Sequence, residues 1–260
     1  MKSEKKQLQE LLEEKYRLYN RIDFISSDPI SIPHLFSKKA DIEIAGFLSA
    51  TIAWGQRTTI INNGKRLMQL MNHQPHEFVL NFTENKKTYL QLKSFVHRTF
   101  NGDDLIYFLL ALQNIYRHHK DMESLFLLGY NKNETDLKNA IIKFRDQFFQ
   151  LPYPTRTLKH FSNPAANSAT KRINMFLRWM VRKDNEGVDF GLWNHIPASV
   201  LSCPLDVHSG NVARKMGLLL RKQNDWKATA ELTAALKEFD PLDPVKFDFA
   251  LFGLGVFEGY

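Results

Sequence analysis

Two side chains of this sequence stand where chemistry on a carbon centre is expected. Lys171 falls in the first turn of an expected helix, and Asp206 falls at the start of another. The positive end of a helix dipole disfavours a second positive charge, and a lysine amine must be neutral to attack carbon. Asp206 supplies a carboxylate. The segment from Ser168 to Gly217 therefore predicts a site with a nucleophilic amine and a carboxylate on a basic surface.

Two helices must position these side chains. The first is expected over 168–183, with Ser168 as its N-cap, and its buried stripe has the 3, 4, 7 spacing of an amphipathic helix. The stripe consists of Ile173, Phe176, Leu177 and Met180. The second helix follows Pro204 and is capped by Asp206. A simpler interpretation stays open, in which Asp206 is only a cap and Lys171 only a surface lysine.

The residues around both helices resemble a known superfamily. Ala169-Thr170-Lys171 and Pro204-Leu205-Asp206-Val207-His208 are similar to the core of the helix-hairpin-helix DNA glycosylases, which include endonuclease III and the 8-oxoguanine glycosylases. The longer pattern KRINMFLRWMVR, PLDVH and DPVKFDFALFGLGV resembles an uncharacterised bacterial family related to them. That closer resemblance covers most of the chain and brings no established activity.

The resemblance implies an all-α, two-lobed helix-hairpin-helix DNA glycosylase-like fold, with residues 1–260 as a single domain and a cleft between its lobes. It implies a base-excision glycosylase with AP-lyase activity that flips a damaged base out of duplex DNA, with Lys171 as nucleophile and Asp206 stabilising the charge on the sugar. The DNA-binding residues that it implies are Arg172, Arg178, Arg182, His208, Asn167 and Ser168. The residues that it suggests for the base pocket are Trp54, Gln56, Trp193 and Phe190.

Two features depart from the superfamily pattern. The hairpin that precedes Lys171 reads Asn163-Pro164-Ala165-Ala166-Asn167-Ser168 where the superfamily is glycine-rich, although asparagine also adopts a left-handed turn. Lys171 and Asp206 are also 35 positions apart, further than in the best-known members. A catalytically inactive nucleic-acid-binding module on the same fold is therefore the alternative, and a metabolic enzyme that acts on a nucleotide is a third interpretation.

Positive charge is concentrated in one part of the chain. The net charge is +7, and residues 151–183 contain seven cations and no acid. The seven are Arg156, Lys159, Lys171, Arg172, Arg178, Arg182 and Lys183. A basic face attracts polyanions, and DNA is the expected partner. The charged face of an ordinary protein is the alternative.

Composition excludes several classes of protein. A single cysteine, Cys203, rules out an internal disulfide and a four-cysteine iron–sulfur cluster. No metal-ligand spacing occurs, and we expect no metal and no other cofactor. No signal peptide and no apolar run of about 18 residues is recognised, so we expect a cytoplasmic protein without membrane contact. The sequence indicates no protein partner.

Helical periodicity extends over most of the remaining sequence, and almost nothing is typical of a strand. Further helices are expected over 4–19, 41–54, 56–71, 75–81, 103–119, 122–129, 134–150, 225–239 and 245–257. The one over 41–54 is apolar nearly all round and is expected to be buried. In the last helix, Gly253 and Gly255 predict close packing, and Asp248 is expected on the surface.

Overall fold

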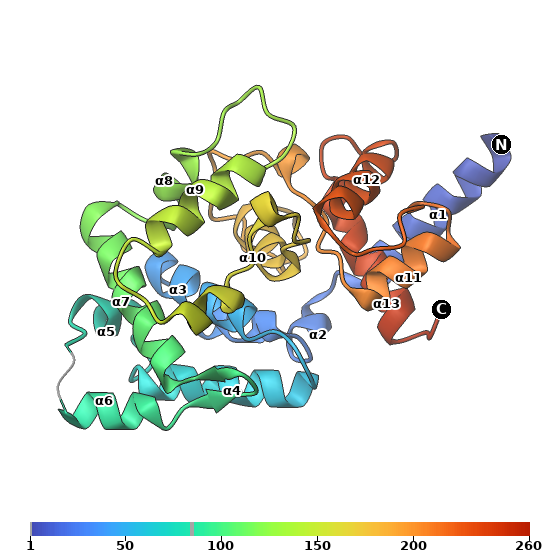
Figure 1. The fold of residues 1–260 in the computed structure, drawn as a ribbon. Coiled ribbons are helices and arrows are strands. Elements are labelled where there is room, and N and C mark those ends of the chain that lie inside the picture. The colour runs from blue at the N-terminus through green and yellow to red at the C-terminus, as the bar shows by residue number, and fades with distance from the viewer. Residues whose placement is uncertain (1, 84–85) are drawn as a thin grey trace. The chain divides into compact units, whose positions relative to one another are not determined.

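Helices form nearly all the regular structure of the part of the chain that the structure describes. The computed structural model describes residues 2–83 and 86–260, and Figure 1 shows its ribbon with the elements labelled. One antiparallel pair of two-residue strands joins β1 (Val96–His97) to β2 (Phe100–Asn101). The all-α prediction is confirmed.

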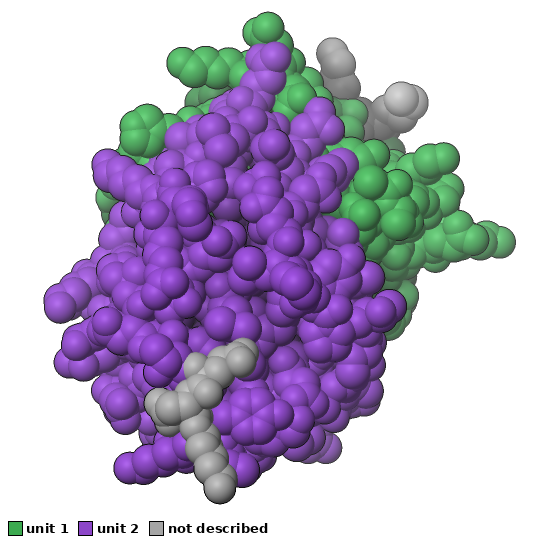
Figure 2. All heavy atoms as spheres, turned by 60° about the vertical axis from the view of Figure 1, so that its left-hand side comes forward, with its two compact units in different colours: residues 1–25, 132–138, 163–260 green, residues 26–131, 139–162 purple. Residues whose placement is uncertain are grey.

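The chain divides into two compact units, which Figure 2 colours green and purple. Unit 1 comprises residues 1–25, 132–138 and 163–260, and unit 2 comprises residues 26–131 and 139–162. Unit 1 contains α1 (Lys2–Tyr19), α2 (Ile22–Ile25), α10 (Lys171–Val181), α11 (Val207–Lys215), α12 (Trp226–Lys237) and α13 (Asp248–Val256). Its 3-10 turns are η4 (Pro164–Ala166), η5 (Ala198–Val200) and η6 (Pro244–Phe247).

Unit 2 contains both strands and the remaining helices. These are α3 (Lys39–Thr51), α4 (Arg57–Leu70), α5 (Pro75–Leu80), α6 (Lys86–Lys93), α7 (Gly102–His118), α8 (Met122–Leu127) and all but the first residue of α9 (Lys138–Phe148). Its 3-10 turns are η1 (Pro29–Ser31), η2 (Pro33–Leu35) and η3 (Thr155–His160). The sequence did not predict α6, because its lysines and threonine obscure any apolar stripe.

Helix α3 lies in the core of unit 2, as its apolar sequence predicts. Every residue from Ile42 to Thr51 is buried. Phe47 lies at the centre of an aromatic cluster, with ring centroids 5.5–6.0 Å from those of Phe108, Phe144, Phe148 and Phe161. Offset and edge-to-face aromatic packing of this kind stabilises a core beyond the area that it buries. The helix ends at Thr51, before the expected Trp54.

In unit 1, helix α13 packs against α1 and α11. Gly253 makes the contact with α1 possible, because a side chain there would overlap the ring of Tyr19. That ring also stacks on Phe257 at 5.4 Å between centroids, so it has little freedom to move away. The close packing expected at Gly253 is confirmed.

Gly253→Ala is therefore expected to destabilise the protein by about 1–3 kcal/mol, the usual cost of overpacking. Gly255→Ala is the matched control. Its new methyl group would lie 3.2 Å from Val212 Cγ2, so that side chain would have to shift only by a few tenths of an ångström. Urea unfolding of the two variants measures the difference. Equal stabilities would contradict the role given to Gly253.

Candidate functional site

Lys171 and Asp206 form an ion pair in unit 1. Lys171 Nζ lies 3.1 Å from Asp206 Oδ2, and the two side chains are 29% and 22% exposed. Lys171 is the first residue of α10, and Asp206 is the N-cap of α11. Two side chains 35 residues apart thus meet, both reachable by solvent. The predicted chemistry requires this contact, because the amine and the carboxylate must act on the same substrate.

Asp206 is held in place by a capping box. Its Oδ1 accepts from the backbone N–H of Ser209 at 2.9 Å, and its own N–H donates to Ser209 Oγ at 3.0 Å. The expected cap is confirmed, and Oδ2 stays available for Lys171. Burial raises the pKa of Asp206, but the Lys171 ammonium and the Ser209 N–H lower it by more. The pKa of Asp206 therefore lies below its usual range, and the carboxyl is ionised at neutral pH.

The hairpin before α10 differs from the expected N-cap geometry. Ser168 does not cap the helix: it pairs with Asp225 in an isolated bridge, and Thr170 is the N-cap, without a side-chain cap bond. Asn167 and Thr170 both have left-handed backbones, at φ +58° and +47°. Asparagine tolerates this region, but a β-branched threonine is strained there.

Two polar atoms beside Lys171 are buried without a hydrogen-bond partner among the described residues. They are Thr170 Oγ1 and Asn174 Oδ1. Asn174 Nδ2 donates to the carbonyl of Ala169 at 3.2 Å, which fixes its amide against the hairpin. Unsatisfied buried polar atoms are rare in folded proteins and often mark functional sites. Backbone strain and unsatisfied polar atoms thus coincide next to the lysine.

The hairpin is braced from the start of α12. Asn167 Nδ2 donates to Asp225 Oδ2 at 2.9 Å, and the N–H of Trp226 donates to the carbonyl of Asn167 at 3.0 Å. Asp225 also pairs with Arg221 through both carboxylate oxygens, one of them 2.7 Å from Arg221 Nε. The residues that fix the hairpin, which precedes α10, therefore come from the segment that follows α11 in the sequence.

Asp248 is buried, so the prediction that it lies on the surface is wrong. Arg178 Nη1 donates to Asp248 Oδ2 at 2.5 Å, and Arg178 Nε lies 3.3 Å from Asp189 Oδ1. Burial raises the pKa of Asp248 to about 6, although the Arg178 and Lys171 cations lower it. The carboxyl of Asp248 thus belongs to the electrostatic surroundings of Lys171.

Arg178 and Arg182 do not form an exposed basic face, and the expectation that they lie on the surface is wrong. Their side chains are 5% and 1% exposed. Arg182 Nη1 lies 2.6 Å from Asp184 Oδ2 and 3.1 Å from Asp189 Oδ2, and Arg182 Nε lies 2.9 Å from Asp243 Oδ2. A buried charge is stable only when it is paired, and these partners satisfy that requirement.

The positive charge of residues 151–183 is therefore partly neutralised. Of the seven cations, the four in ion pairs are Arg156, Lys171, Arg178 and Arg182. Arg156 lies 3.2 Å from Asp104 in unit 2. The stretch also belongs to both units, which divide between residues 162 and 163. Arg178 and Arg182, being buried, add nothing to a basic face.

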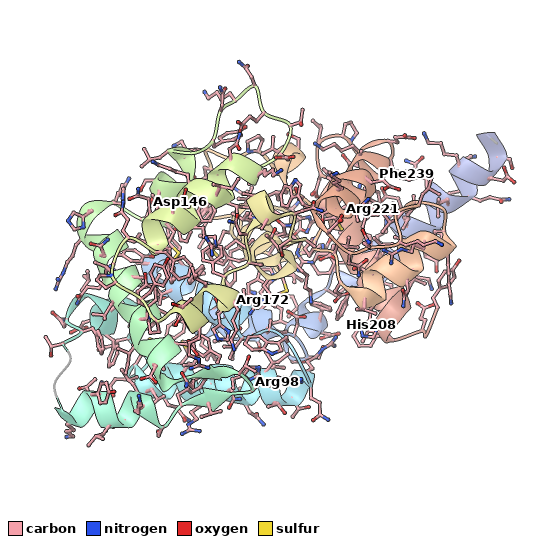
Figure 3. The ribbon with its side chains drawn as sticks, viewed as in Figure 1. Arg98, Asp146, Arg172, His208, Arg221 and Phe239 are labelled. Atoms are coloured by element: carbon pink, nitrogen blue, oxygen red, sulfur yellow. The ribbon has the colours of Figure 1, made fainter. Side chains whose placement is uncertain are left out.

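The other residues predicted in unit 1 occupy different environments. Arg172 is half-buried, directly after Lys171, and His208 is exposed in the first turn of α11; Figure 3 labels both. Trp193 is 1% exposed and meets Phe176 edge to face at 5.5 Å. It is packed in the core of unit 1. Phe190 is half-buried.

Trp54 and Gln56 belong to unit 2. The Trp54 ring stacks on His160 at 5.9 Å and meets His97 edge to face at 4.9 Å, while its carbonyl lies 3.0 Å from His97 Nε2. Gln56 is the exposed N-cap of α4, and its side chain makes no cap bond. Trp54 therefore has structural contacts of its own, while the Gln56 side chain stays accessible.

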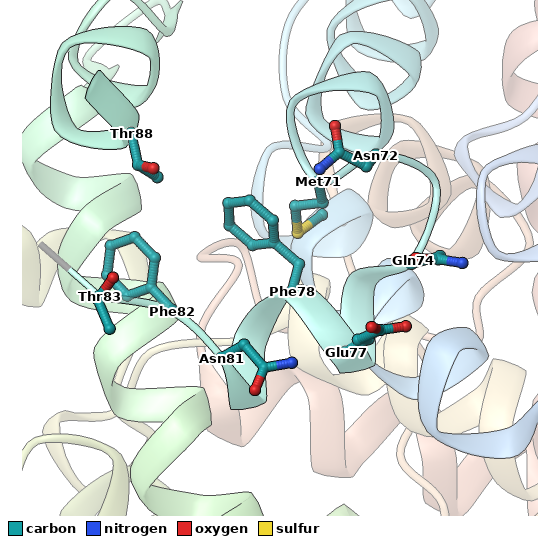
Figure 4. Close-up of a pocket in the computed structure, with 9 residues that line it drawn as sticks. All are labelled: Met71, Asn72, Gln74, Glu77, Phe78, Asn81, Phe82, Thr83 and Thr88. Carbon is teal, nitrogen blue, oxygen red and sulfur yellow. The ribbon is translucent and has the colours of Figure 1, made fainter. Parts of the chain in front are cut away.

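A hollow of about 220 Å³ lies elsewhere in unit 2. Figure 4 shows its lining residues, among them Met71, Phe78 and Asn81 around α5. The lining includes none of the four residues suggested for the base pocket. Among the described residues, no cluster of histidine, cysteine or acidic side chains fits a metal ion. Within the same residues, no helix is long and apolar enough to cross a membrane.

A family model matches residues 28–257, which is most of the chain and includes both Lys171 and Asp206. The chain belongs to the family described as Protein of unknown function (DUF2400). Comparisons with curated proteins and with solved structures found no match. The DUF2400 match covers every element of the Lys171–Asp206 site and the hairpin that precedes it.

Sequence reasoning missed several residues that shape this site in the DUF2400 chain. Ser209 was detectable, because an aspartate followed three residues later by serine suits a reciprocal cap. Asn174, Asp225 and Asp248 were not assigned to the site. Asp225 was recognised as a helix start, but its link to the hairpin depends on a contact across 58 positions that periodicity does not show.

Proposed function

We propose that this protein is a DNA glycosylase with AP-lyase activity, in which Lys171 is the nucleophile and Asp206 the carboxylate. The observation that carries the proposal is the 3.1 Å contact between Lys171 Nζ and Asp206 Oδ2 at a solvent-accessible position. We also propose a helix-hairpin-helix glycosylase-like fold, supported by the turn over 163–170 that leads directly into the helix of Lys171.

The pair suits each step of the reaction. Asp206 lies within reach to take a proton from the Lys171 ammonium, and the freed amine attacks C1′ of a deoxyribose. The bond from C1′ to the base breaks, and the base leaves with the electron pair and takes the proton from Asp206, which becomes an anion again. The C1′–O4′ bond then breaks, O4′ takes a proton from the nitrogen of the adduct, and a protonated imine forms between Lys171 and C1′. Loss of a C2′ proton from this imine expels the 3′ phosphate and cuts the strand.

Charge explains why the carboxylate is needed. Positive charge develops on the sugar as the base leaves, and a fixed anion there lowers the barrier. Asp206 is suited to this because its pKa is lowered, so it stays ionised at neutral pH. Its capping box also fixes its position before substrate arrives. A preorganised charge needs no rearrangement during the reaction.

Phosphate contacts are proposed for the residues at the two helix starts. Arg172 and His208 stand beside the reacting pair, and Asn167 and Ser168 belong to the hairpin. Helix N-termini attract phosphate through their unpaired N–H groups. The damaged base would be extruded from the stack, because C1′ chemistry of this kind requires access that a closed duplex denies.

Borohydride trapping tests the proposal. Wild-type protein is incubated with duplexes that contain an abasic site, 8-oxoguanine or uracil, and sodium borohydride reduces any imine to a stable adduct. We expect an adduct on at least one duplex and none with Lys171→Gln. Lys183→Gln is the matched control, because Lys183 is exposed and follows the same helix. An adduct that persists in Lys171→Gln would refute Lys171 as the nucleophile.

A nucleic-acid-binding module without catalysis is the second candidate. The hairpin favours it, because it has no glycine and two of its residues, Asn167 and Ser168, are engaged with Asp225. Close approach of a phosphate to backbone N–H groups is easiest where glycine is present. Salt-dependent DNA binding without an adduct on any duplex would support this candidate.

A further inference from the structure

The hollow of about 220 Å³ in unit 2 has an apolar floor. Met71 and Phe82 are 1% and 4% exposed, and Phe78 is half-buried. The rings of Phe78 and Phe82 stack at 6.0 Å between their centroids, and Figure 4 shows the Phe78 ring beside the Met71 side chain. Aromatic and thioether groups therefore form the surface that the hollow offers to a ligand.

The rim of this hollow is polar. It includes four exposed side chains, those of Asn72, Gln74, Glu77 and Asn81. None of these four side chains has a hydrogen-bond or ionic partner within residues 2–83 and 86–260. Each amide offers a carbonyl acceptor, and an ionised glutamate offers acceptors only. An acceptor-rich rim is thus available to a ligand that donates hydrogen bonds.

The electrostatic field in the hollow is negative. Glu77 brings a carboxylate, and no lysine or arginine belongs to the lining that the structure describes. Helices α4 and α5 both end here, since their C-caps, Met71 and Asn81, are lining residues. The C-terminus of a helix carries partial negative charge. Gln113 and Arg117 bond the last carbonyl of α5, so α4 supplies the larger part of this field.

Helix α5, which carries much of the lining, is fixed at both ends. At its start, the N–H of His76 donates to Asp41 Oδ1 at 2.9 Å. At its end, Gln113 Nε2 lies 2.9 Å from the carbonyl oxygens of Val79 and Phe82. A wall that is already in place loses little entropy when a ligand binds.

We propose that this hollow binds a guanidinium group on a short aliphatic stem, with the guanidinium paired to Glu77 and the stem on Phe78. A guanidinium is planar, has donors only and stacks on aromatic rings, which matches an acceptor-rich rim above an aromatic floor. The negative field repels phosphates and carboxylates, and one carboxylate above apolar groups does not suit a metal ion. The hollow is smaller than the roughly 300 Å³ at which sites for drug-sized ligands begin, so the ligand is small. The inference goes beyond the proposed function and does not depend on it.

Titration of isotope-labelled protein with n-butylguanidinium, followed by two-dimensional NMR, tests the proposal. The side-chain amide resonances of Asn72, Gln74 and Asn81 report binding at the rim directly. We expect them to shift to saturation, and Glu77→Gln to raise the Kd about tenfold, because charge-assisted hydrogen bonds are lost. Asp146→Asn removes an exposed acid from α9 in the same unit, outside the lining, and should leave the Kd unchanged.

A neutral probe of the same shape separates charge from shape. n-Butylurea keeps the stem and the planar head but lacks the charge, so it should bind the wild-type protein about tenfold more weakly. Equal Kd values for the two probes would overturn the proposal, and so would an unchanged Kd in Glu77→Gln or rim amides that do not shift. The same titration with the peptide acetyl-Gly-Arg-Gly-amide identifies the source of the guanidinium. Binding of the peptide as tight as that of n-butylguanidinium supports an arginine side chain of a protein, and exclusion of the peptide supports a free small molecule.

Discussion

Asp206→Asn is expected to lower the rate of base excision by about two to three orders of magnitude without unfolding the protein. The asparagine keeps the size of the side chain and removes its charge. It can no longer stabilise positive charge on the sugar or take a proton from Lys171, whose amine lies 3.1 Å away. Single-turnover excision, with substrate limiting and enzyme in excess, measures the chemical step directly.

The capping role of Asp206 provides an internal control. Asparagine and serine both cap helices well, so Asp206→Asn and Asp206→Ser should cost less than about 1 kcal/mol of stability through the cap. Asp206→Ala loses the acceptor of the Ser209 N–H and should cost about 1 kcal/mol more. All three variants lose the charge and should lose activity alike. Wild-type activity in Asp206→Asn would contradict a catalytic carboxylate and leave only a cap.

Acid unfolding offers a second measurement on the same variant. The pKa of Asp206 is lower in the folded protein than in the unfolded chain, so the ion pair contributes stability above about pH 4. That contribution is lost as the pH falls through the folded pKa. The difference in unfolding free energy between wild type and Asp206→Asn should therefore shrink from pH 7 to pH 3. Urea titrations at the two pH values measure it.

The parts of the site that the sequence predicts are those set by local rules. Pro204 and the aspartate two residues after it predict the cap at Asp206, and the apolar spacing predicts the buried stripe of α10. These rules involve neighbours within about one helical turn. They place Lys171 and Asp206 each at a helix start, but they do not bring the two helices together.

The failed predictions involve partners that are distant in sequence. Arg178 and Arg182 were expected to be exposed because periodicity assigns polar residues to the solvent side. Asp184 is two positions from Arg182, but the other carboxylate partners, Asp189, Asp243 and Asp248, lie between 7 and 70 positions away. The expected Ser168 cap failed for a related reason, since Asp225 engages that residue from 57 positions further along. Only the tertiary fold decides such pairings.

Arg182→Met is expected to destabilise the protein by about 3–5 kcal/mol, the largest change in stability for any single residue discussed above. Its guanidinium bonds three carboxylates and the hydroxyl of Tyr16, at 2.8 Å, so it joins the end of α10 to α1 and to the turn before η6. Methionine fills the space but removes this cation from the buried carboxylate of Asp189 and from the partly buried carboxylates of Asp184 and Asp243. Removing one partner from a buried ionic network costs more than the network contributes, because the remaining charges stay desolvated.

Lys183→Gln tests whether this cost comes from burial and not from loss of a positive charge in general. Lys183 is the next residue and is exposed, so its substitution should change stability by less than about 0.5 kcal/mol. Urea unfolding of both variants, followed by circular dichroism, gives the comparison. Asp243 forms its ion pair with Arg182, so replacing Asp243 by asparagine in the Arg182→Met background removes one of the uncompensated charges and should recover part of the loss. If Arg182→Met and Lys183→Gln unfold at the same urea concentration, the arginine is a surface cation and the network does not hold unit 1 together.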